Sequence, residues 1–452
     1  MDNGIKRMVD DRFDDFVREL VELVRRPSVS ATGEGVEECA DYLVAKMERW
    51  GIDAEIEQVP DGEPVIIGRV GPEGKCPTLL VYDHYDVQPP EPLDEWEYEP
   101  FSGEISGERM YGRGTTDSKG NLMAYLSAVR LLSETGKMPL SVKFLFEGEE
   151  EIGSPHLRSF VSSTDSLDAD AVVCCDSELD PSGRPMISLG MKGLIYLELR
   201  SRAAKTDMHS SKAALVPSAA WNLVDALRSL RDSEGNIQIE GWTDGLVEPT
   251  EEEIELLRKI PFDEEEIRKE TGARELLRGR HGLEALRGFL YEPTCNIAGL
   301  TSGYQGEGSK TVLPAEASAK LDMRLVYDQS AERCIQLLRD HLAVKGFGEL
   351  EITVHGRLEP SHTPLSAPIS RAAADAAREV YETDAVIYPK HHASGPDYIF
   401  TKDLGMHSIW TGCSPADGRA HAPNEFIGLE EYRKGILYAC ELISRFAGES
   451  SQ

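Results

Sequence analysis

The stretch that decides the fold reads Thr78-Leu79-Leu80-Val81-Tyr82-Asp83-His84-Tyr85-Asp86-Val87. Its opening run, 78–81, has the length and composition of a buried strand. His84 and Asp86 follow at the carboxyl end of that strand, one residue apart and therefore on the same face. A histidine with a carboxylate two residues away suits a metal ligand whose second ring nitrogen is held by a neighbour. A solvated loop histidine is the alternative, and this stretch alone leaves both open.

Two further apolar runs also end in acidic residues. The run 142–146 leads into Glu147-Gly148-Glu149-Glu150-Glu151, and the run 171–175 ends at Asp176. Helical patterns lie between the runs, so the sequence predicts an α/β fold with a mostly parallel sheet and helices on both faces. Ligands of such sheets bind beyond the carboxyl ends of the strands. We therefore expect the acidic side chains and His84 to gather at one edge of the sheet.

The length of the chain, 452 residues, favours two domains rather than one core. Near Gly190 the pattern changes, and the run 194–200 alternates apolar and polar residues like a half-exposed strand. We expect residues 1–190 and 363–452 to form a catalytic domain, with an α+β domain, residues 191–362, inserted between them. The inserted domain is predicted to contain helical stretches at 217–230, 251–290 and 331–344 and strands at 317–326 and 350–354.

The net charge of −32 argues against nucleic acid as a partner, since phosphates need basic surface. Acidic runs such as 251–253 and 264–266 fit solvated helix faces. No apolar run approaches the roughly 18 residues of a membrane span. The acidic start lacks the basic and apolar pattern of a signal peptide, so the expected location is the cytoplasm. The 8 cysteines form no C-x-x-C pair, which disfavours a zinc ribbon.

The three consecutive glutamates 149–151 would repel one another unless water or cations neutralise them. On an exposed helix they would form a solvated face. At the mouth of a parallel sheet, a divalent metal explains them better, with further donors available from His84, Asp117, Asp176 and His421. Histidines and carboxylates in mixture suit zinc, with cobalt or manganese as alternatives. Asp117 precedes a helical stretch, where a role as N-cap is its alternative.

Four motifs occur in the order typical of one known family. They are His84-Tyr85-Asp86, Gly112-Arg113-Gly114-Thr115-Thr116-Asp117-Ser118-Lys119-Gly120, Glu149-Glu150-Glu151-Ile152-Gly153-Ser154 and Ala420-His421-Ala422-Pro423-Asn424-Glu425. Together they resemble the di-zinc exopeptidase superfamily. That group holds the cytosolic and carnosine dipeptidases, carboxypeptidase G, the aminoacylases, acetylornithine deacetylase and succinyl-diaminopimelate desuccinylase. The resemblance spans nearly the whole chain.

The resemblance implies two Zn²⁺ ions in each subunit, with Asp117 bridging them. His84 and Asp176 would hold one ion, and Glu151 and His421 would hold the other. Co²⁺ or Mn²⁺ are the alternative metals for the same ligands.

The resemblance also implies that Glu150 is the general base and acid, which takes the proton of the attacking water and passes it to the leaving amine. Asp86 would orient His84. Glu150 is preferred over Glu149 because the family's glutamate pair directly precedes the turn, here 152–154.

In the inserted domain, Asp207-Met208-His209-Ser210 resembles the family's histidine that reaches the neighbouring subunit's active site. The resemblance therefore implies a homodimer, in which His209 helps to hold the oxyanion, and a lid or dimerisation role for the inserted domain. An exposed loop histidine is the alternative.

Four residues are candidates to bind the substrate. Thr311, within 308–314, resembles the dipeptidase threonine that touches the substrate's terminal carboxylate, whereas the position of the lysine there does not fit Walker A. Arg324 suits the same carboxylate through a bidentate fork, with a structural salt bridge as the alternative. Ser394 and Gly395 lie in a turn that only partly matches the dipeptidases' glycine-glycine-serine turn.

The sequence therefore predicts a zinc-dependent amidohydrolase that cleaves small peptides with a free C-terminal carboxylate, as a dipeptidase or carboxypeptidase. Pro100-Phe101-Ser102, the lysine-threonine loop and the long insert favour the dipeptidase branch. One alternative is a deacylase of the same superfamily that acts on N-acyl amino acids. Another is a binding protein on a catalytically dead scaffold. A nucleotide-binding α/β protein is disfavoured, because Walker A and a strand-linked GxGxxG are both absent.

Overall fold

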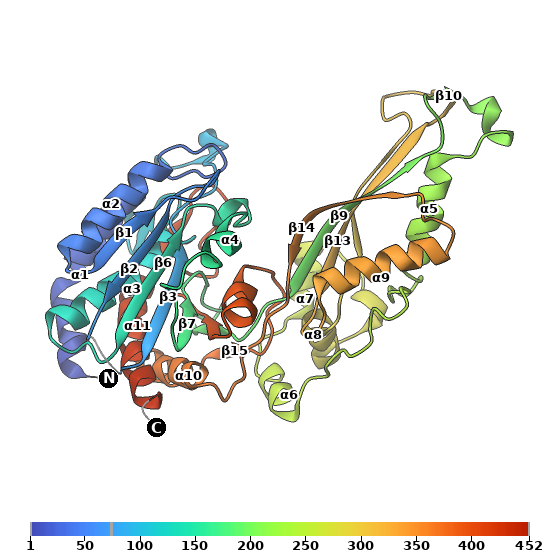
Figure 1. Cartoon of the computed structure of the whole chain (residues 1–452). Helices are drawn as coiled ribbons and strands as arrows, with labels where there is room; N and C mark the ends of the chain where they lie inside the picture. The colour runs from blue at the N-terminus through green and yellow to red at the C-terminus, as the bar shows by residue number, and fades with distance from the viewer. Residues whose placement is uncertain (1, 73–75, 451–452) are drawn as a thin grey trace. The chain divides into compact units, whose positions relative to one another are not determined.

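The computed structural model describes residues 2–72 and 76–450 and divides the chain into two compact units (Figure 1). Unit 1 comprises Met1–Gly190, His362–Pro389 and Ile399–Gln452, and unit 2 comprises Met191–Ser361 and Lys390–Tyr398. The boundaries expected from the sequence differ from these mainly at Lys390–Tyr398, which belongs to unit 2. The backbone N–H of Lys192 donates to the carbonyl of Ala393 at 2.9 Å and so ties this segment to unit 2.

Unit 1 contains an eight-stranded sheet with the order β1-β2-β6-β3-β7-β16-β8-β15. The strands are β1 Asp53–Glu57, β2 Val65–Val70, β3 Thr78–His84, β6 Ser141–Glu147, β7 Ala171–Cys174, β8 Met186–Ser188, β15 Val386–Tyr388 and β16 His407–Trp410. The pairs β6–β3, β3–β7, β7–β16 and β8–β15 are parallel. The predicted mostly parallel sheet is therefore confirmed, and its antiparallel pairs lie at β1–β2, β2–β6 and β16–β8.

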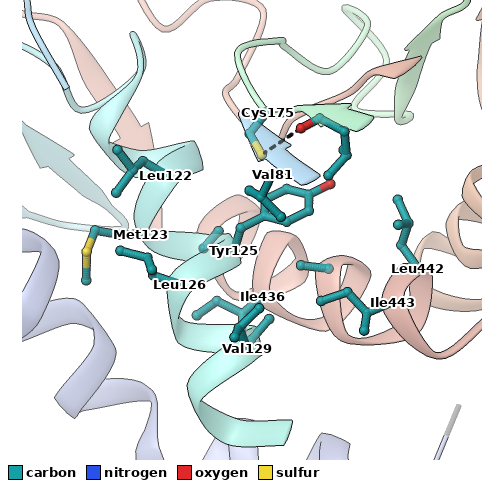
Figure 2. Close-up of a cluster of buried hydrophobic side chains, with 14 of the residues drawn as sticks. Val81, Leu122, Met123, Tyr125, Leu126, Val129, Cys175, Ile436, Leu442 and Ile443 are labelled. Atoms are coloured by element: carbon teal, nitrogen blue, oxygen red, sulfur yellow. Dashed lines mark hydrogen bonds between the residues drawn. The ribbon is translucent and has the colours of Figure 1, made fainter. Parts of the chain in front are cut away.

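Helices enclose this sheet. The helices of unit 1 are α1 Asn3–Val24, α2 Val36–Arg49, α3 Lys119–Glu134, α4 Leu157–Val161, α10 Pro368–Tyr381 and α11 Leu429–Glu449. Val81 of β3, Leu126 of α3 and Ile436 of α11 belong to one buried cluster (Figure 2). Tyr82, on the opposite face of β3, has its ring centroid 5.0 Å from that of Phe400 in the π-helical turn Ile399–Asp403. Both faces of β3 are thus covered, as expected for a central parallel strand.

A small sheet of unit 1 holds the loops next to α3 and α11. It pairs β4 Glu104–Ser106 with β5 Arg109–Tyr111, and β5 with β17 Phe426–Gly428. β17 directly follows the loop that carries His421. Its pairing with β5 therefore brings the His421 loop beside the loop between β5 and α3, which carries Asp117.

Unit 2 is built on a four-stranded antiparallel sheet with the order β11-β13-β9-β14. Its strands are β9 Gly193–Arg202, β11 Asn296–Ser302, β13 Glu316–Leu325 and β14 Glu351–Leu358, and a separate pair joins β10 Met208–His209 to β12 Val312–Leu313. Its helices are α5 Ala219–Leu230, α6 Glu251–Leu257, α7 Glu264–Thr271, α8 Gly282–Tyr291 and α9 Ala331–Val344. The predicted α+β character of this part of the chain agrees with these elements.

The helical stretch expected at 251–290 divides into α6, α7 and α8. Pro261 lies between α6 and α7, and its ring cannot continue a helix. Gly272 ends α7 in the left-handed conformation, with φ 68°. Hydrophobic periodicity alone did not resolve these breaks.

The longest helices, α1 and α11, contain 22 and 21 residues. Each buries one face in the core of unit 1, with Leu20 of α1 and Ile443 of α11 fully buried. Over the described residues, none of the helices combines the length and the apolar character that crossing a bilayer would require.

Candidate metal centre

The predicted ligands of unit 1 lie on five separate segments. His84 is the last residue of β3, Asp176 follows β7, and Glu151 lies in the short 3₁₀ turn Glu150–Ile152 after β6. Asp117 precedes α3, whose N-cap is Ser118, so its side chain does not occupy the N-cap position. Parallel β3, β6 and β7 end at the same edge of the sheet, which brings their following residues together.

Asp117 lies between two histidines. Its Oδ1 is 3.1 Å from Nε2 of His84, and its Oδ2 is 2.9 Å from Nε2 of His421. Nε2 of His421 is also 3.0 Å from Oε2 of Glu151, and Nε2 of His84 is 3.9 Å from Oδ2 of Asp176. The donor atoms of His84, Asp117 and Asp176 lie within 4.8 Å of one another, as do those of Asp117, Glu151 and His421. The structure therefore contains two groups of three donors that share Asp117.

The electrostatics of the two groups reflect their burial. Burial, with the charge of Asp117 beside it, raises the pKa of Asp176 to about 7. Burial also acts to raise the pKa of Asp117, but the imidazoles of His421 and His84 outweigh it and hold that pKa below its ordinary value. Hydrogen bonds to Asp117 and Glu151 raise the pKa of His421 to about 10. The acidic side chains thus favour a proton on His421, and burial favours a proton on Asp176.

The chemistry of this donor set fits divalent metal ions. Imidazole nitrogens and carboxylate oxygens are the ligands that zinc accepts outside thiolate sites, and manganese and cobalt accept them as well. A carboxylate shared between two donor groups is the arrangement found where two ions act as one centre. Such ions would replace the protons that the cluster otherwise holds.

Asp86 is completely buried and joins His84 to the turn that carries the glutamates. Its Oδ1 lies 3.3 Å from Nδ1 of His84. The backbone N–H groups of Glu150 and Glu151 donate to its two carboxylate oxygens at 3.2 and 3.1 Å. One side chain thus orients a predicted ligand and the predicted base together.

Glu150 and Glu149 face different surroundings. Over the described residues, neither donor group includes Glu150. Burial raises the pKa of Glu150 well above its ordinary value, although the charge of His84 opposes this shift. A carboxylate that holds a proton readily beside a metal centre suits a general base. Glu149 instead places an oxygen 2.8 Å from Nδ1 of His156.

His209 and Thr311 lie together in unit 2. The Nδ1 atom of His209 accepts from the backbone N–H of Ser211 at 3.2 Å, and its Nε2 lies 3.3 Å from Oγ1 of Thr311. Because Nδ1 accepts, the proton of the neutral ring is on Nε2. The side chain of His209 is exposed and able to donate from Nε2.

Arg324 and Ser394 form the second pair in unit 2. Nη1 of Arg324 donates to Oγ of Ser394 at 2.8 Å, and Gly395 is buried beside Ser394. Arg324 also places Nε 3.5 Å from Oδ1 of Asp322, the contact that a structural salt bridge would make. This pair lies at the end of β13, whereas Thr311 precedes its start. The ten residues of β13 span about 30 Å, so the two pairs lie at opposite ends of the sheet.

Three residues around the metal centre had no role assigned from the sequence. Nε2 of Gln88 donates to Oε2 and to the backbone carbonyl of Glu151, both at 3.0 Å. Arg113 and Glu425 form a buried ion pair with an Nη1–Oε2 distance of 2.7 Å. Arg113 and Glu425 each lie inside one of the four sequence motifs, and this position could have drawn attention to them. Gln88 lies in none of the motifs.

The chain is similar to known peptidases over most of its length. The sequence pattern described as peptidase family M20/M25/M40 matches residues 80–445, a range that contains all four motifs. The Cys-Gly metallodipeptidase dug1 of Schizosaccharomyces pombe is 27% identical over 468 residues, which cover 98% of each chain. The Beta-Ala-His dipeptidase of Rattus norvegicus is 28% identical over 403 residues, covering 85% of this chain and 81% of the relative.

A solved structure resembles the chain closely. The M20 family metallo-carboxypeptidase Sso-CP2 from Sulfolobus solfataricus has 39% sequence identity and a TM-score of 0.89. The match covers 96% of this chain and 99% of that chain. The likeness therefore extends over both units and is not confined to the motifs.

Proposed function

The chain belongs to peptidase family M20/M25/M40, and on that premise we propose a two-metal peptidase that cleaves dipeptides and short peptides with a free C-terminal carboxylate. The observation that carries the proposal is the position of Asp117, which is shared by two groups of metal donors. A single structural metal would need only one such group. Two groups with a common carboxylate are the arrangement of a two-metal hydrolase.

We assign Zn²⁺ to both donor groups, with Co²⁺ or Mn²⁺ able to substitute. His84 and Asp176 would hold one ion, Glu151 and His421 the other, and Asp117 both. When bound, such ions polarise an amide carbonyl and lower the pKa of water, so that water attacks near neutral pH.

The protein's own groups move the proton and fix the geometry. Glu150 takes a proton from the attacking water and delivers it to the leaving amine. Asp86 holds the backbone of Glu150 in place through the N–H of that residue, at 3.2 Å. The Nε2–H of His209 donates to the oxyanion that forms on the substrate carbonyl.

We propose that the substrate's terminal carboxylate binds to Arg324 and Ser394, with Gly395 lining the same turn. Thr311 would bind substrate next to His209, whose Nε2 lies 3.3 Å from its Oγ1. Arginine recognises a carboxylate through two parallel N–H donors. The curated relatives include dipeptidases, and Sso-CP2 is a carboxypeptidase. Substrates of both kinds carry a free carboxylate next to the bond that is cleaved.

We also propose a homodimer, which the positions of the two residue pairs at the two ends of β13 support. β13, about 30 Å long, lies between His209 with Thr311 and Arg324 with Ser394. This length supports a proposal in which one active site receives the two pairs from different subunits. The edge strand β11 offers an interface, because Ile297 and Leu300 are 49% and 55% exposed there. An exposed apolar edge strand readily pairs with a second chain.

We propose the cytoplasm as the location of the protein. Its eight cysteines all lie in the described part of the chain and form no disulfide bond there, and six of them are buried. Thiols persist in reducing compartments. Fractionation of the source cells checks this assignment.

The test of the function is a substrate panel on metal-free protein reconstituted with Zn²⁺, Co²⁺ or Mn²⁺. The panel contains Cys-Gly, β-Ala-His, a tripeptide, and N-acetyl and N-succinyl amino acids. We expect hydrolysis of the peptides by reconstituted protein and none by the metal-free protein. Turnover of the N-acyl amino acids alone would identify a deacylase. A protein that binds no metal and hydrolyses nothing would be a binding protein on the same scaffold.

A further inference from the structure

We propose that the buried pair Arg113–Glu425 is a positioning device that sets Asp117 against His421. The pair lies behind the two donor groups and belongs to neither. The inference rests on the proposed function, since it takes Asp117 and His421 as metal ligands. Neither Arg113 nor Glu425 has a role in the proposed mechanism.

Glu425 holds the backbone that carries Asp117. Its Oε1 accepts from the backbone N–H groups of Thr116 and Asp117 at 2.8 and 3.1 Å. Its Oε2 accepts from the N–H of Gly114 at 3.1 Å and from Nη1 of Arg113 at 2.7 Å. The carboxylate is fully buried, so the three backbone donors depend on it rather than on water, whereas Nη1 of Arg113 also donates to the carbonyl of Ala422 at 3.5 Å.

Arg113 connects this carboxylate to the neighbouring loops. It is 1% exposed, and its Nη2 donates to the carbonyl of Pro89 at 3.1 Å, in the loop that follows Asp86. Its own backbone N–H donates to the carbonyl of Pro100 at 2.7 Å. Three loops that surround the donor groups therefore meet at one ion pair.

The loop that carries His421 needs such support. His421 and Asn424 have φ values of 60° and 62°, in the left-handed region that side chains rarely adopt. Asn424 fixes the outer side of the loop, because its Oδ1 accepts from the N–H of Glu97 at 2.6 Å. Glu425 fixes the inner side, and its carbonyl also accepts from the N–H of Gly112 at 2.9 Å.

The contacts require a carboxylate rather than any polar group of the same shape. A carboxylate offers two acceptor oxygens, whereas the amide of glutamine offers one oxygen and one donor. In Glu425→Gln, the NH₂ group would replace one of the two oxygens, and two of the four donors would lose their acceptor. Nη1 of Arg113 lies 2.7 Å from Oε2 of Glu425, and its positive charge favours the carboxylate form of that side chain.

The experiment measures Co²⁺ binding by titration and by the visible absorption spectrum of the bound ion, together with kcat and KM. For Glu425→Gln we expect Co²⁺ affinity and kcat to fall about 10- to 100-fold, as for other groups that orient ligands. KM should stay within about threefold, since both side chains are buried and neither belongs to the proposed substrate contacts. The Co²⁺ spectrum should change, because the ligand geometry changes.

Asp180→Asn is the matched control. Asp180 is also a buried carboxylate, and it accepts from the backbone N–H groups of Ser182 and Arg184 and from the Arg184 side chain. Its partners lie within its own turn, so this variant should lose stability but retain Co²⁺ affinity, spectrum and kcat. If Co²⁺ affinity fell equally in Asp180→Asn and Glu425→Gln, general destabilisation would explain the effect of Glu425→Gln. That result would overturn the proposal.

The remaining outcomes separate this inference from the proposed function. If wild-type protein binds no Co²⁺, the proposed function fails. If wild-type protein and Glu425→Gln bind Co²⁺ with equal affinity and equal spectra, only the positioning role fails. Should Glu425→Gln not fold, Arg113→Lys takes its place, because lysine keeps the charge but cannot reach both Glu425 and Pro89. The same fall in Co²⁺ affinity is expected for it.

Discussion

Nε2 of His84 lies 3.1 Å from Oδ1 of Asp117. The other oxygen of the same carboxylate lies 2.9 Å from Nε2 of His421. In the part of the chain that the structure describes, Asp117 is the residue common to both donor groups. A change at Asp117 should therefore affect both proposed metal sites, whereas a change at a ligand of one group should affect that group.

Asp117→Asn should weaken both metal sites, because the amide supplies neither the charge nor the second oxygen that a shared ligand needs. Asp176→Asn should weaken only the site that contains His84. Metal content after dialysis, measured by elemental analysis, distinguishes the two variants. Retention of two ions per chain in Asp117→Asn would contradict the shared-ligand assignment.

Glu150→Gln should lower kcat by about 10²- to 10⁴-fold, the usual contribution of a general acid and base, while leaving metal content unchanged. Glu149→Gln is its neighbouring control, because Glu149 contacts His156 and lies outside the described donor groups. We expect that control to keep kcat within a few-fold of wild type. A Glu150→Gln enzyme with near-normal kcat would show that another group moves the proton.

Metal affinity should fall as the pH falls. The pKa of Asp176 is raised to about 7 and that of His421 to about 10 in the metal-free protein, so both groups hold protons below these values. A cation must displace those protons, and each displaced proton changes the affinity about tenfold per pH unit. Zn²⁺ titrations by calorimetry at about pH 6 to 8, in buffers of different ionisation enthalpy, should show more than one proton released near pH 7. A pH-independent affinity would contradict this.

Hydrophobic patterning predicted the strands and helices that carry the site, because strand and helix periodicity are local properties of the chain. The apolar runs 142–146 and 171–175 correspond to β6 and β7, and the helical stretch 331–344 has the observed bounds of α9. Residues directly after parallel strands are then brought to one edge by topology, as His84 and Asp176 are.

Hydrophobic patterning could not predict the hydrogen bonds that hold these residues, because the partners are distant in the chain. Glu425 accepts from the N–H of Asp117 across 308 residues, and Arg324 donates to Ser394 across 70 residues. Gln88 is an ordinary polar residue that lies just outside the motif His84-Tyr85-Asp86. The same reason explains the segment 390–398, whose membership in unit 2 depends on tertiary contacts and not on periodicity.

A mixed dimer of two impaired variants distinguishes whether His209 acts on its own subunit or on the partner subunit. His209→Ala alone should lower kcat about 10²- to 10³-fold, as the loss of one oxyanion donor does. In a mixed dimer with Glu150→Gln, the subunit that keeps Glu150 would receive an intact His209 from its partner. One of its two sites would then be fully functional.

Coexpression of Glu150→Gln and His209→Ala should therefore restore about a quarter of wild-type activity, since half of randomly paired dimers are mixed and each has one intact site. If His209 served its own subunit, the mixed dimer would contain no intact site, and activity would stay at the level of the single variants. Purification through two different affinity tags isolates the mixed dimer. Its activity then decides between the two arrangements directly, because neither parent contributes a functional site by itself.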